Sequence, residues 1–356
     1  MQNNKVVLVL VPLIFFMRIE VDNMDGRLEN QKKGEAKIKN MMKGQPEVIH
    51  EFYVYLNDKT YKTKIMYINR AIAFVEYLNQ NAFDVTEMET FAEVKPSNVN
   101  DYMEKIRYKE DGTEYSESYR ALQLNVIKSF FQFLEDDGYV IKNPARKLKA
   151  PRVGNQTNIT YLTKDEIKQI KRNMKQGVGN ARERTIQKKW YERDYAIFAL
   201  ALCTGLRIAA LLEINISDID FDNKMIRVTE KENITKDVYL SEEIIGVLQK
   251  WIDKRNTMLE EKGCEEDALF ISFRMKRMDA SSVNEMIKKY TYNIDKKITA
   301  HKLRSTFATN IYEATGDIYV TSHLLGHSNI ETTKRYAALD QEKERRAMDK
   351  ISKKLF

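Results

Sequence analysis

A basic, proline-containing stretch divides this sequence and limits the folds open to it. The segment KNPARKLKAPRVGNQTN, residues 142–158, has prolines at 144 and 151, no acidic residue and a polar end. Proline interrupts regular structure because it lacks a backbone N–H and restricts the residue before it. We therefore predict a basic linker over residues 144–158 between two domains. A chain of 356 residues is long enough to give each domain its own core.

Before the linker, apolar side chains recur at helical spacing. Ile65, Ile68 and Ile72 form one such series, and Val126 and Phe130 belong to another. This pattern predicts a small bundle of four or five helices over residues 45–143. We expect the tyrosines and phenylalanines of this stretch to form its core.

Residues 1–44 are an N-terminal extension of uncertain structure. An apolar run at residues 6–17, VVLVLVPLIFFM, resembles the hydrophobic part of a signal peptide. No small-residue cleavage site follows it, and twelve residues are too short to span a bilayer as a helix. We interpret the run as a short buried or partner-facing segment, or as sequence ahead of a true start at Met17 or Met24.

After the linker, residues 159–356 combine helical patterns with a short region of strands. Thr163 and Glu166 have the spacing of a capping box at a helix start. The segment DIDFDNKMIRVTEKENITKDVYLS, residues 218–241, alternates and contains turn residues, which predicts two or three short antiparallel strands. The expected fold class is mostly α with a small antiparallel β-sheet, in a helical domain followed by a mixed α/β domain.

Positive charge is concentrated around the linker. The formal net charge is +7, whereas residues 142–189 alone hold fourteen Lys or Arg and three Asp or Glu. Such a local excess attracts phosphate backbones, although an ordinary solvated surface has the same composition. The candidate DNA-binding side chains in the linker are Arg146, Lys147, Lys149 and Arg152.

No sequence pattern indicates a metal or nucleotide cofactor. Cys203 and Cys264 form neither a disulfide framework nor a metal motif, and they fit a reducing, cytoplasmic setting. His323 and His327 have the spacing of a zinc pair, but no third ligand stands at a recognisable spacing. There is also no phosphate-cradling glycine loop. We therefore expect no metal and no cofactor.

Two arginines, two histidines and a tyrosine lie in short motifs, and four of these five residues lie near the C-terminus. They are Arg207, His301, Arg304, His327 and Tyr336. This combination suits the transfer of a phosphodiester to a phenol. Guanidinium groups hold non-bridging phosphate oxygens and offset the charge that grows in the transition state. A tyrosine hydroxyl can attack phosphorus, and a histidine can help to remove its proton. The predicted hairpin supplies Lys231 and Lys236 as candidate proton donors to the leaving alkoxide.

In order and spacing, the segments TGLR, EKEN, HKLRSTFAT, LLGHS and TTKRY resemble the motifs of the tyrosine recombinase (phage integrase) family. The resemblance extends over residues 45–356. It implies that residues 45–143 are a helical core-site DNA-binding domain and that residues 159–356 are a catalytic domain with a C-terminal tail helix. The two domains would close around duplex DNA as a clamp.

The resemblance also implies a site-specific DNA recombinase that serves integration, excision, inversion or resolution. Its implied catalytic set is Arg207, Lys231, His301, Arg304, His327 and Tyr336. The tyrosine would form a 3′-phosphotyrosine, the arginines would bind the scissile phosphate, and the lysine would be the general acid. The first histidine would assist proton transfer, and the second would hydrogen-bond the phosphate. Four protomers would act in pairs on two sites in double-stranded DNA.

Two other functions remain open from the sequence. One is relaxation of a single duplex by the same chemistry, as in a type IB topoisomerase, and the other is DNA binding without catalysis. The C-terminal tail argues against relaxation of a single duplex, because its apolar side chains lie on one helical face. They are Ala347, Met348, Ile351 and Leu355. This stripe is available to a neighbouring protomer or packs on its own domain.

Overall fold

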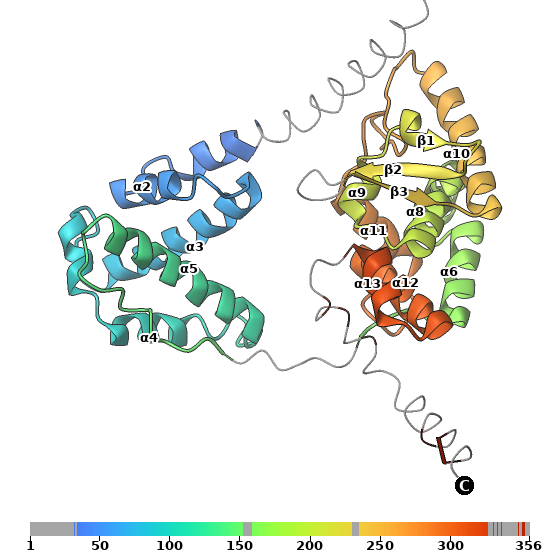
Figure 1. Ribbon diagram of the computed structural model, residues 1–356. Coiled ribbons are helices and arrows are strands. Elements are labelled where there is room, and N and C mark those ends of the chain that lie inside the picture. The colour runs from blue at the N-terminus through green and yellow to red at the C-terminus, as the bar shows by residue number, and fades with distance from the viewer. Residues whose placement is uncertain are drawn as a thin grey trace, which may run out of the picture. The chain divides into compact units, whose positions relative to one another are not determined.

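The computed structural model describes residues 32, 34–151, 159–229, 235–326, 330, 333, 336, 348, 351 and 352. The chain divides into two compact units, Met1–Asn155 and Gln156–Phe356 (Figure 1). The division falls within the stretch expected to be the linker. The apolar run at residues 6–17 lies outside the described residues.

The first unit is helical, in agreement with the predicted fold class. Its elements are α2 (Glu47–Tyr55), α3 (Tyr61–Gln80), the short 3-10 helix η1 (Met88–Glu93), α4 (Pro96–Lys105) and α5 (Glu117–Asp136). The two long helices begin at hydroxyl caps: the side chain of Thr60 accepts from the amide of Thr63, and that of Ser116 accepts from the amide of Tyr119. Residues 34–41 are also helical.

Aromatic side chains fill the core of this unit, as predicted for its phenylalanines. The prediction is wrong for Tyr55 and Tyr108, which are 37% and 53% exposed. The ring of Phe130 meets Phe52 edge to face at 5.2 Å and Phe91 at 5.6 Å. Such edge-to-face contacts are favourable because the positive edge of one ring meets the negative face of the other. Ile38 and Met42 belong to the same core. The core of this unit therefore includes two residues that precede the expected domain start at residue 45.

The second unit combines helices with a small sheet. Its helices are α6 (Lys164–Gln176), α7 (Ala181–Lys189), α8 (Tyr191–Thr204), α9 (Ile208–Leu212), η2 (Ile216–Asp218), α10 (Glu242–Glu260), α11 (Ala280–Tyr290), α12 (Ala300–Thr315) and α13 (Ile318–Leu325). The strands β1 (Ile219–Asp220), β2 (Met225–Thr229) and β3 (Thr235–Tyr239) form an antiparallel sheet in the order β1-β2-β3. The predicted small antiparallel sheet is confirmed.

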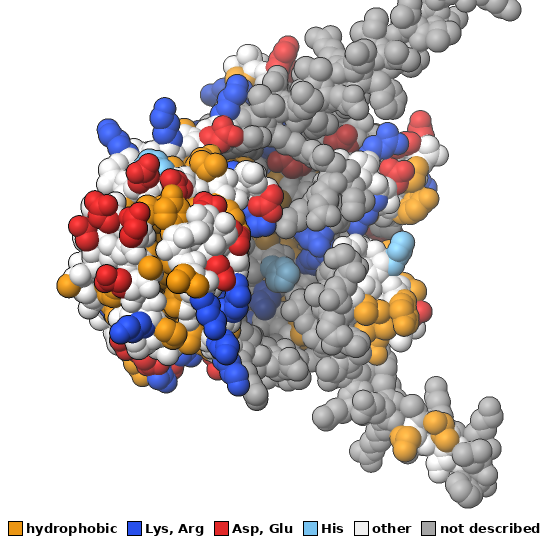
Figure 2. Space-filling model, turned by 60° about the vertical axis from the view of Figure 1, so that its left-hand side comes forward, with side chains coloured by type: hydrophobic (Ala, Val, Ile, Leu, Met, Phe, Trp, Pro, Cys, Tyr) orange, Lys and Arg blue, Asp and Glu red, His pale blue; other side chains and the backbone are white. Residues whose placement is uncertain are grey.

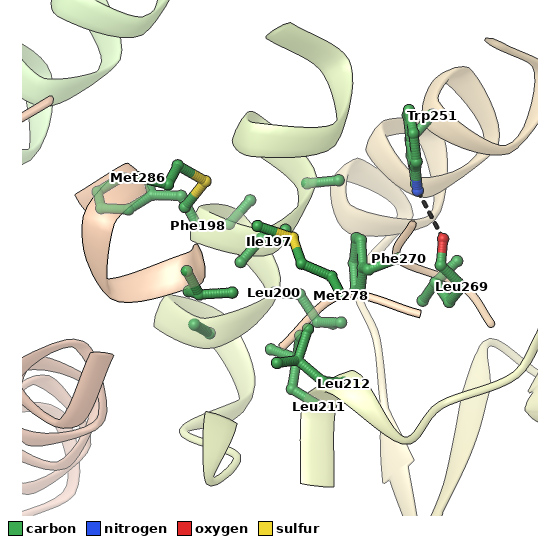
Figure 3. Close-up of a cluster of buried hydrophobic side chains, with 14 of the residues drawn as sticks. Ile197, Phe198, Leu200, Leu211, Leu212, Trp251, Leu269, Phe270, Met278 and Met286 are labelled. Atoms are coloured by element: carbon green, nitrogen blue, oxygen red, sulfur yellow. Dashed lines mark hydrogen bonds between the residues drawn. The ribbon is translucent and has the colours of Figure 1, made fainter. Parts of the chain in front are cut away.

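Helix α8 lies at the centre of this unit, and its residues 196–201 are apolar and buried at every position. It packs against α6, α7, α10 and α12, and Figure 1 shows it between the sheet and the α12–α13 pair. Figure 3 shows part of the surrounding core, with Ile197, Phe198, Leu200, Leu211, Leu212, Trp251, Leu269, Phe270, Met278 and Met286 labelled. The indole of Trp251 donates to the carbonyl of Leu269 at 2.8 Å. None of the described helices is long and apolar enough to cross a membrane.

A buried ion pair lies within α8, and its carboxylate also links α8 to α11. Arg193 and Asp194 are 3% and 1% exposed, and Arg193 Nη2 donates to Asp194 Oδ1 at 2.7 Å. Tyr290 donates its hydroxyl hydrogen to the other carboxylate oxygen at 2.9 Å. Burial and the nearby carboxylate raise the pKa of Tyr290 above its usual range, so this phenol stays a donor.

Candidate active site

The TGLR segment turns sharply at the end of α8. Gly205 has φ +61°, a left-handed conformation that favours glycine. A Cβ at this position would lie 2.2 Å from Cδ1 of Phe307 in α12. Glycine is therefore required both for the turn and for the close approach of α12. Arg207 follows as the residue that precedes α9, and its side chain is partly buried.

Arg304 connects three of the predicted motif segments. Its side chain is 4% exposed. Nη1 donates to the carbonyl of Gly205 at 2.6 Å, and Nη2 donates to the carbonyl of Leu325. Gly205 lies two residues before Arg207, and Leu325 lies two residues before His327. The guanidinium on α12 thus holds the TGLR turn and the end of α13 at fixed positions.

His301 lies one turn before Arg304 on α12, and its environment differs. The side chain of His301 is exposed, whereas that of Arg304 is buried. One helix therefore presents an accessible imidazole beside a guanidinium whose position is set by two carbonyls. This arrangement suits an accessible proton acceptor next to a rigid anion-binding group.

Tyr336 packs close to the same segments. It is 2% exposed and belongs to a small cluster with Phe307, Ala308 and Leu325. Two of these residues come from α12, and the third supplies the carbonyl that Arg304 holds. The structure therefore brings Arg304 and Tyr336 to one region. Helix α13 ends at Gly326, with φ +60°, and His327 lies outside the described residues.

Of the two candidate lysines of the hairpin, only Lys236 lies within the described residues. Lys236 in β3 lies opposite Val228 in β2. Val228 is buried, so Lys236 lies on the inner face of the sheet, since paired residues share a face. The exposed ion pair between Arg227 and Asp237 marks the outer face. Lys231 lies outside the described residues.

The predicted DNA contacts of the linker have different environments. Arg146 is half exposed and forms an ion pair with Glu135 of α5. Lys147 and Lys149 are exposed, and Arg152 lies outside the described residues. The N-terminal unit around them carries acidic and basic side chains interspersed on the face shown in Figure 2.

Several groups that form the site were not predicted from the sequence. Backbone carbonyls of Gly205 and Leu325 hold Arg304, and every residue has a carbonyl, so no pattern singles these two out. Thr306 of α12 accepts from the amide of Leu162 at 2.9 Å and so ties α12 to the chain before α6. The one sequence feature that could have indicated the turn is Gly205, which directly follows an apolar helical run. Within the part of the chain that the structure describes, no cluster of three or more His, Cys, Asp or Glu could hold a metal ion.

Comparison with known proteins identifies the family. The model of the phage integrase family matches residues 160–343. A tyrosine recombinase XerC of Caldanaerobacter subterraneus subsp. tengcongensis is 30% identical over 323 residues, which cover 86% of each chain.

Two solved structures share the fold. The XerH site-specific recombinase bound to a palindromic difH substrate has a TM-score of 0.65 at 17% identity, over 83% of this chain and 82% of that one. The Tn1549 transposon integrase in complex with transposon right-end DNA has a TM-score of 0.62 at 21% identity, over 84% and 99%. The family model matches more than half of the chain, and the XerC relative matches most of it. The chain therefore belongs to the phage integrase family and is a tyrosine recombinase, an enzyme of site-specific DNA recombination.

Proposed function

We propose that this recombinase cleaves and rejoins double-stranded DNA through a 3′-phosphotyrosine at Tyr336. The observation that carries this assignment is the position of Arg304. Its buried guanidinium joins the TGLR turn to the end of α13, and Tyr336 packs against the same residues. An anion-binding group and a phenol in one region are what phosphodiester transfer to tyrosine needs.

The proposed chemistry conserves the energy of the broken bond. The Tyr336 oxygen attacks phosphorus, the bond from phosphorus to the 5′-oxygen breaks, and His301 assists removal of the phenol proton. Lys231 protonates the leaving 5′-oxygen, while Arg207 and Arg304 hold the non-bridging oxygens. A 5′-hydroxyl from a partner strand then attacks the phosphotyrosine and releases the enzyme. His327 donates a hydrogen bond to the same phosphate.

Duplex DNA is the proposed substrate, and the cytoplasm is the proposed place of action. The two solved relatives are described in complex with a difH substrate and with transposon DNA. Lys147, Lys149 and Arg152 are the proposed linker contacts to the DNA backbone. Arg146 would first have to exchange its ion pair with Glu135 for a phosphate.

Covalent cleavage should need neither a metal ion nor ATP. We expect the protein to form an adduct with a nicked suicide substrate in excess EDTA, because arginines rather than a metal offset the phosphate charge. The adduct is measured as a slower band on a denaturing gel. Loss of cleavage with EDTA and recovery with Mg²⁺, at unchanged DNA binding, would contradict the arginine mechanism.

Lys231 should be the general acid rather than Lys236. General acid catalysis typically contributes about 10²–10⁴-fold, so Lys231→Ala should slow cleavage by a factor in that range. In a substrate with sulfur in place of the bridging 5′-oxygen, the leaving group is a thiolate, which needs little protonation. It should restore cleavage by Lys231→Ala and leave Arg304→Ala impaired. Rescue of Lys236→Ala alone would reverse the assignment.

We propose that the tail mediates self-association, with four protomers on two DNA sites. Met348 and Ile351 are helical and are 70% and 53% exposed. Burying a large apolar side chain fully is worth about 1.5–3 kcal/mol, so two of them can supply a weak protein–protein contact. Ala347 and Leu355, the other members of the predicted stripe, lie outside the described residues.

Deleting residues 341–356 should lower cooperative binding to paired sites and lower recombination. Binding to a single site should persist, because the linker and both arginines remain. The measurement is a gel-shift titration of full-length and truncated protein on DNA with one or two half-sites. Equal cooperativity of the two proteins would mean that the tail packs within its own unit.

A further inference from the structure

The helix that carries His301 and Arg304 receives its N-terminal cap from another helix. The first four backbone N–H groups of a helix have no partner within it. Thr299 precedes α12, but its side chain makes no capping hydrogen bond. The amide of Ala300, the first residue of α12, instead donates to Oδ1 of Asn284 at 3.0 Å. Asn284 lies in the middle of α11.

A second hydrogen bond fixes the orientation of the Asn284 amide. Its Nδ2 donates to the carbonyl of Ala280, one turn earlier on α11, at 3.0 Å. A flipped amide would present an N–H to the N–H of Ala300 and an oxygen to the carbonyl of Ala280. Both bonds would then be lost, so only one orientation fits. Asn284 is therefore a fixed acceptor at the start of α12.

The two motif residues on α12 depend differently on this contact. Arg304 is buried and is held by its own bonds to two carbonyls. His301 directly follows Ala300, and its side chain is exposed. The backbone that carries the His301 imidazole therefore begins at the amide that Asn284 holds.

We propose that Asn284 is a positioning residue that sets the start of α12 and thereby places His301 for proton transfer. The inference rests on the proposed function and deepens it. Asn284 touches neither DNA nor the reacting atoms in this role. Its loss should slow the covalent step without weakening the binding of DNA.

Three variants separate this role from a general loss of stability. Because small misplacements of catalytic groups can cost about 10²-fold, Asn284→Ala should slow adduct formation by about ten- to a hundredfold at an unchanged dissociation constant for DNA. Asn284→Asp keeps an acceptor for Ala300 and adds a negative charge that favours a helix N-terminus, but it loses the donor to the carbonyl of Ala280, so it should recover part of the rate. Asn173→Ala is the matched control, since Asn173 Nδ2 donates to Tyr290 O and Asn293 Oδ1 and not to α12. It should react at the parent rate.

A double-mutant cycle tests the route through His301. In a His301→Ala background, Asn284→Ala should add little further slowing, because the group that it positions is already absent. Equal slowing in both backgrounds, or equal slowing by Asn173→Ala, would overturn the positioning role. Normal adduct formation by Asn284→Ala would overturn this role alone. A parent protein that forms no adduct would overturn the proposed function together with it.

Discussion

Replacing Tyr336 with phenylalanine is expected to abolish the covalent protein–DNA adduct and to leave DNA binding unchanged. Only the hydroxyl oxygen, which is the proposed nucleophile, is removed. The ring of Tyr336 is 2% exposed and packs with Phe307, Ala308 and Leu325, and a phenylalanine ring keeps those contacts. The assay compares adduct formation on a suicide substrate with gel-shift binding to the same DNA. An adduct formed by the variant would exclude Tyr336 as the nucleophile.

The control for this prediction is Tyr290→Phe, in the same unit. Tyr290 donates its hydroxyl hydrogen to the buried carboxylate of Asp194. Hydrogen bonds to charged groups are worth about 1.5–3 kcal/mol, so this variant should unfold at lower denaturant concentration. It should nevertheless form the adduct, because Tyr290 lies in the core between α8 and α11. If the control is less stable but still forms the adduct, the loss of the adduct in Tyr336→Phe comes from the missing hydroxyl and not from lower stability.

Local patterns predicted the elements that local hydrogen bonds build. The amide of Glu166 donates to the hydroxyl of Thr163 at 3.3 Å, and the Glu166 carboxylate accepts from the amide of Thr163 at 2.7 Å. This capping box involves only two residues, three positions apart, so it can be predicted from the sequence. Alternation likewise predicted β2 and β3, because buried and exposed positions alternate along a strand that is covered on one face.

The contacts between elements could not be predicted in this way. Arg304 bonds a carbonyl 99 residues earlier and another 21 residues later, and neither distance belongs to a sequence period. Asn284 has no feature that marks it as a cap for a helix 16 residues away. Charge counting pointed to Arg146 as a DNA contact but could not reveal its ion pair with Glu135. The motifs predict which groups react, and long-range hydrogen bonds decide how Arg304 and the start of α12 are held.

Arg304→Lys should be among the most damaging single changes to catalysis, although it keeps the positive charge. A lysine ammonium is a point charge and lacks the planar fork that bonds two carbonyls and a phosphate together. Removing one preorganised donor to a transition-state oxyanion costs about 10²–10³-fold, and we expect cleavage to fall by at least that factor. A buried carbonyl left without a donor costs about 1–3 kcal/mol, so the free energy of unfolding should also fall.

The matched control is Arg255→Lys, which removes a similar buried guanidinium from the same unit. Arg255 is 3% exposed, and it donates to the carbonyls of Ala268 and Glu266, which lie outside the motif segments. Denaturant unfolding should show a comparable loss of stability in both variants, while only Arg304→Lys loses cleavage. If the two variants lost cleavage equally, the effect of Arg304 would be structural. If Arg304→Lys cleaved DNA at the parent rate, its guanidinium would not bind the scissile phosphate in the transition state.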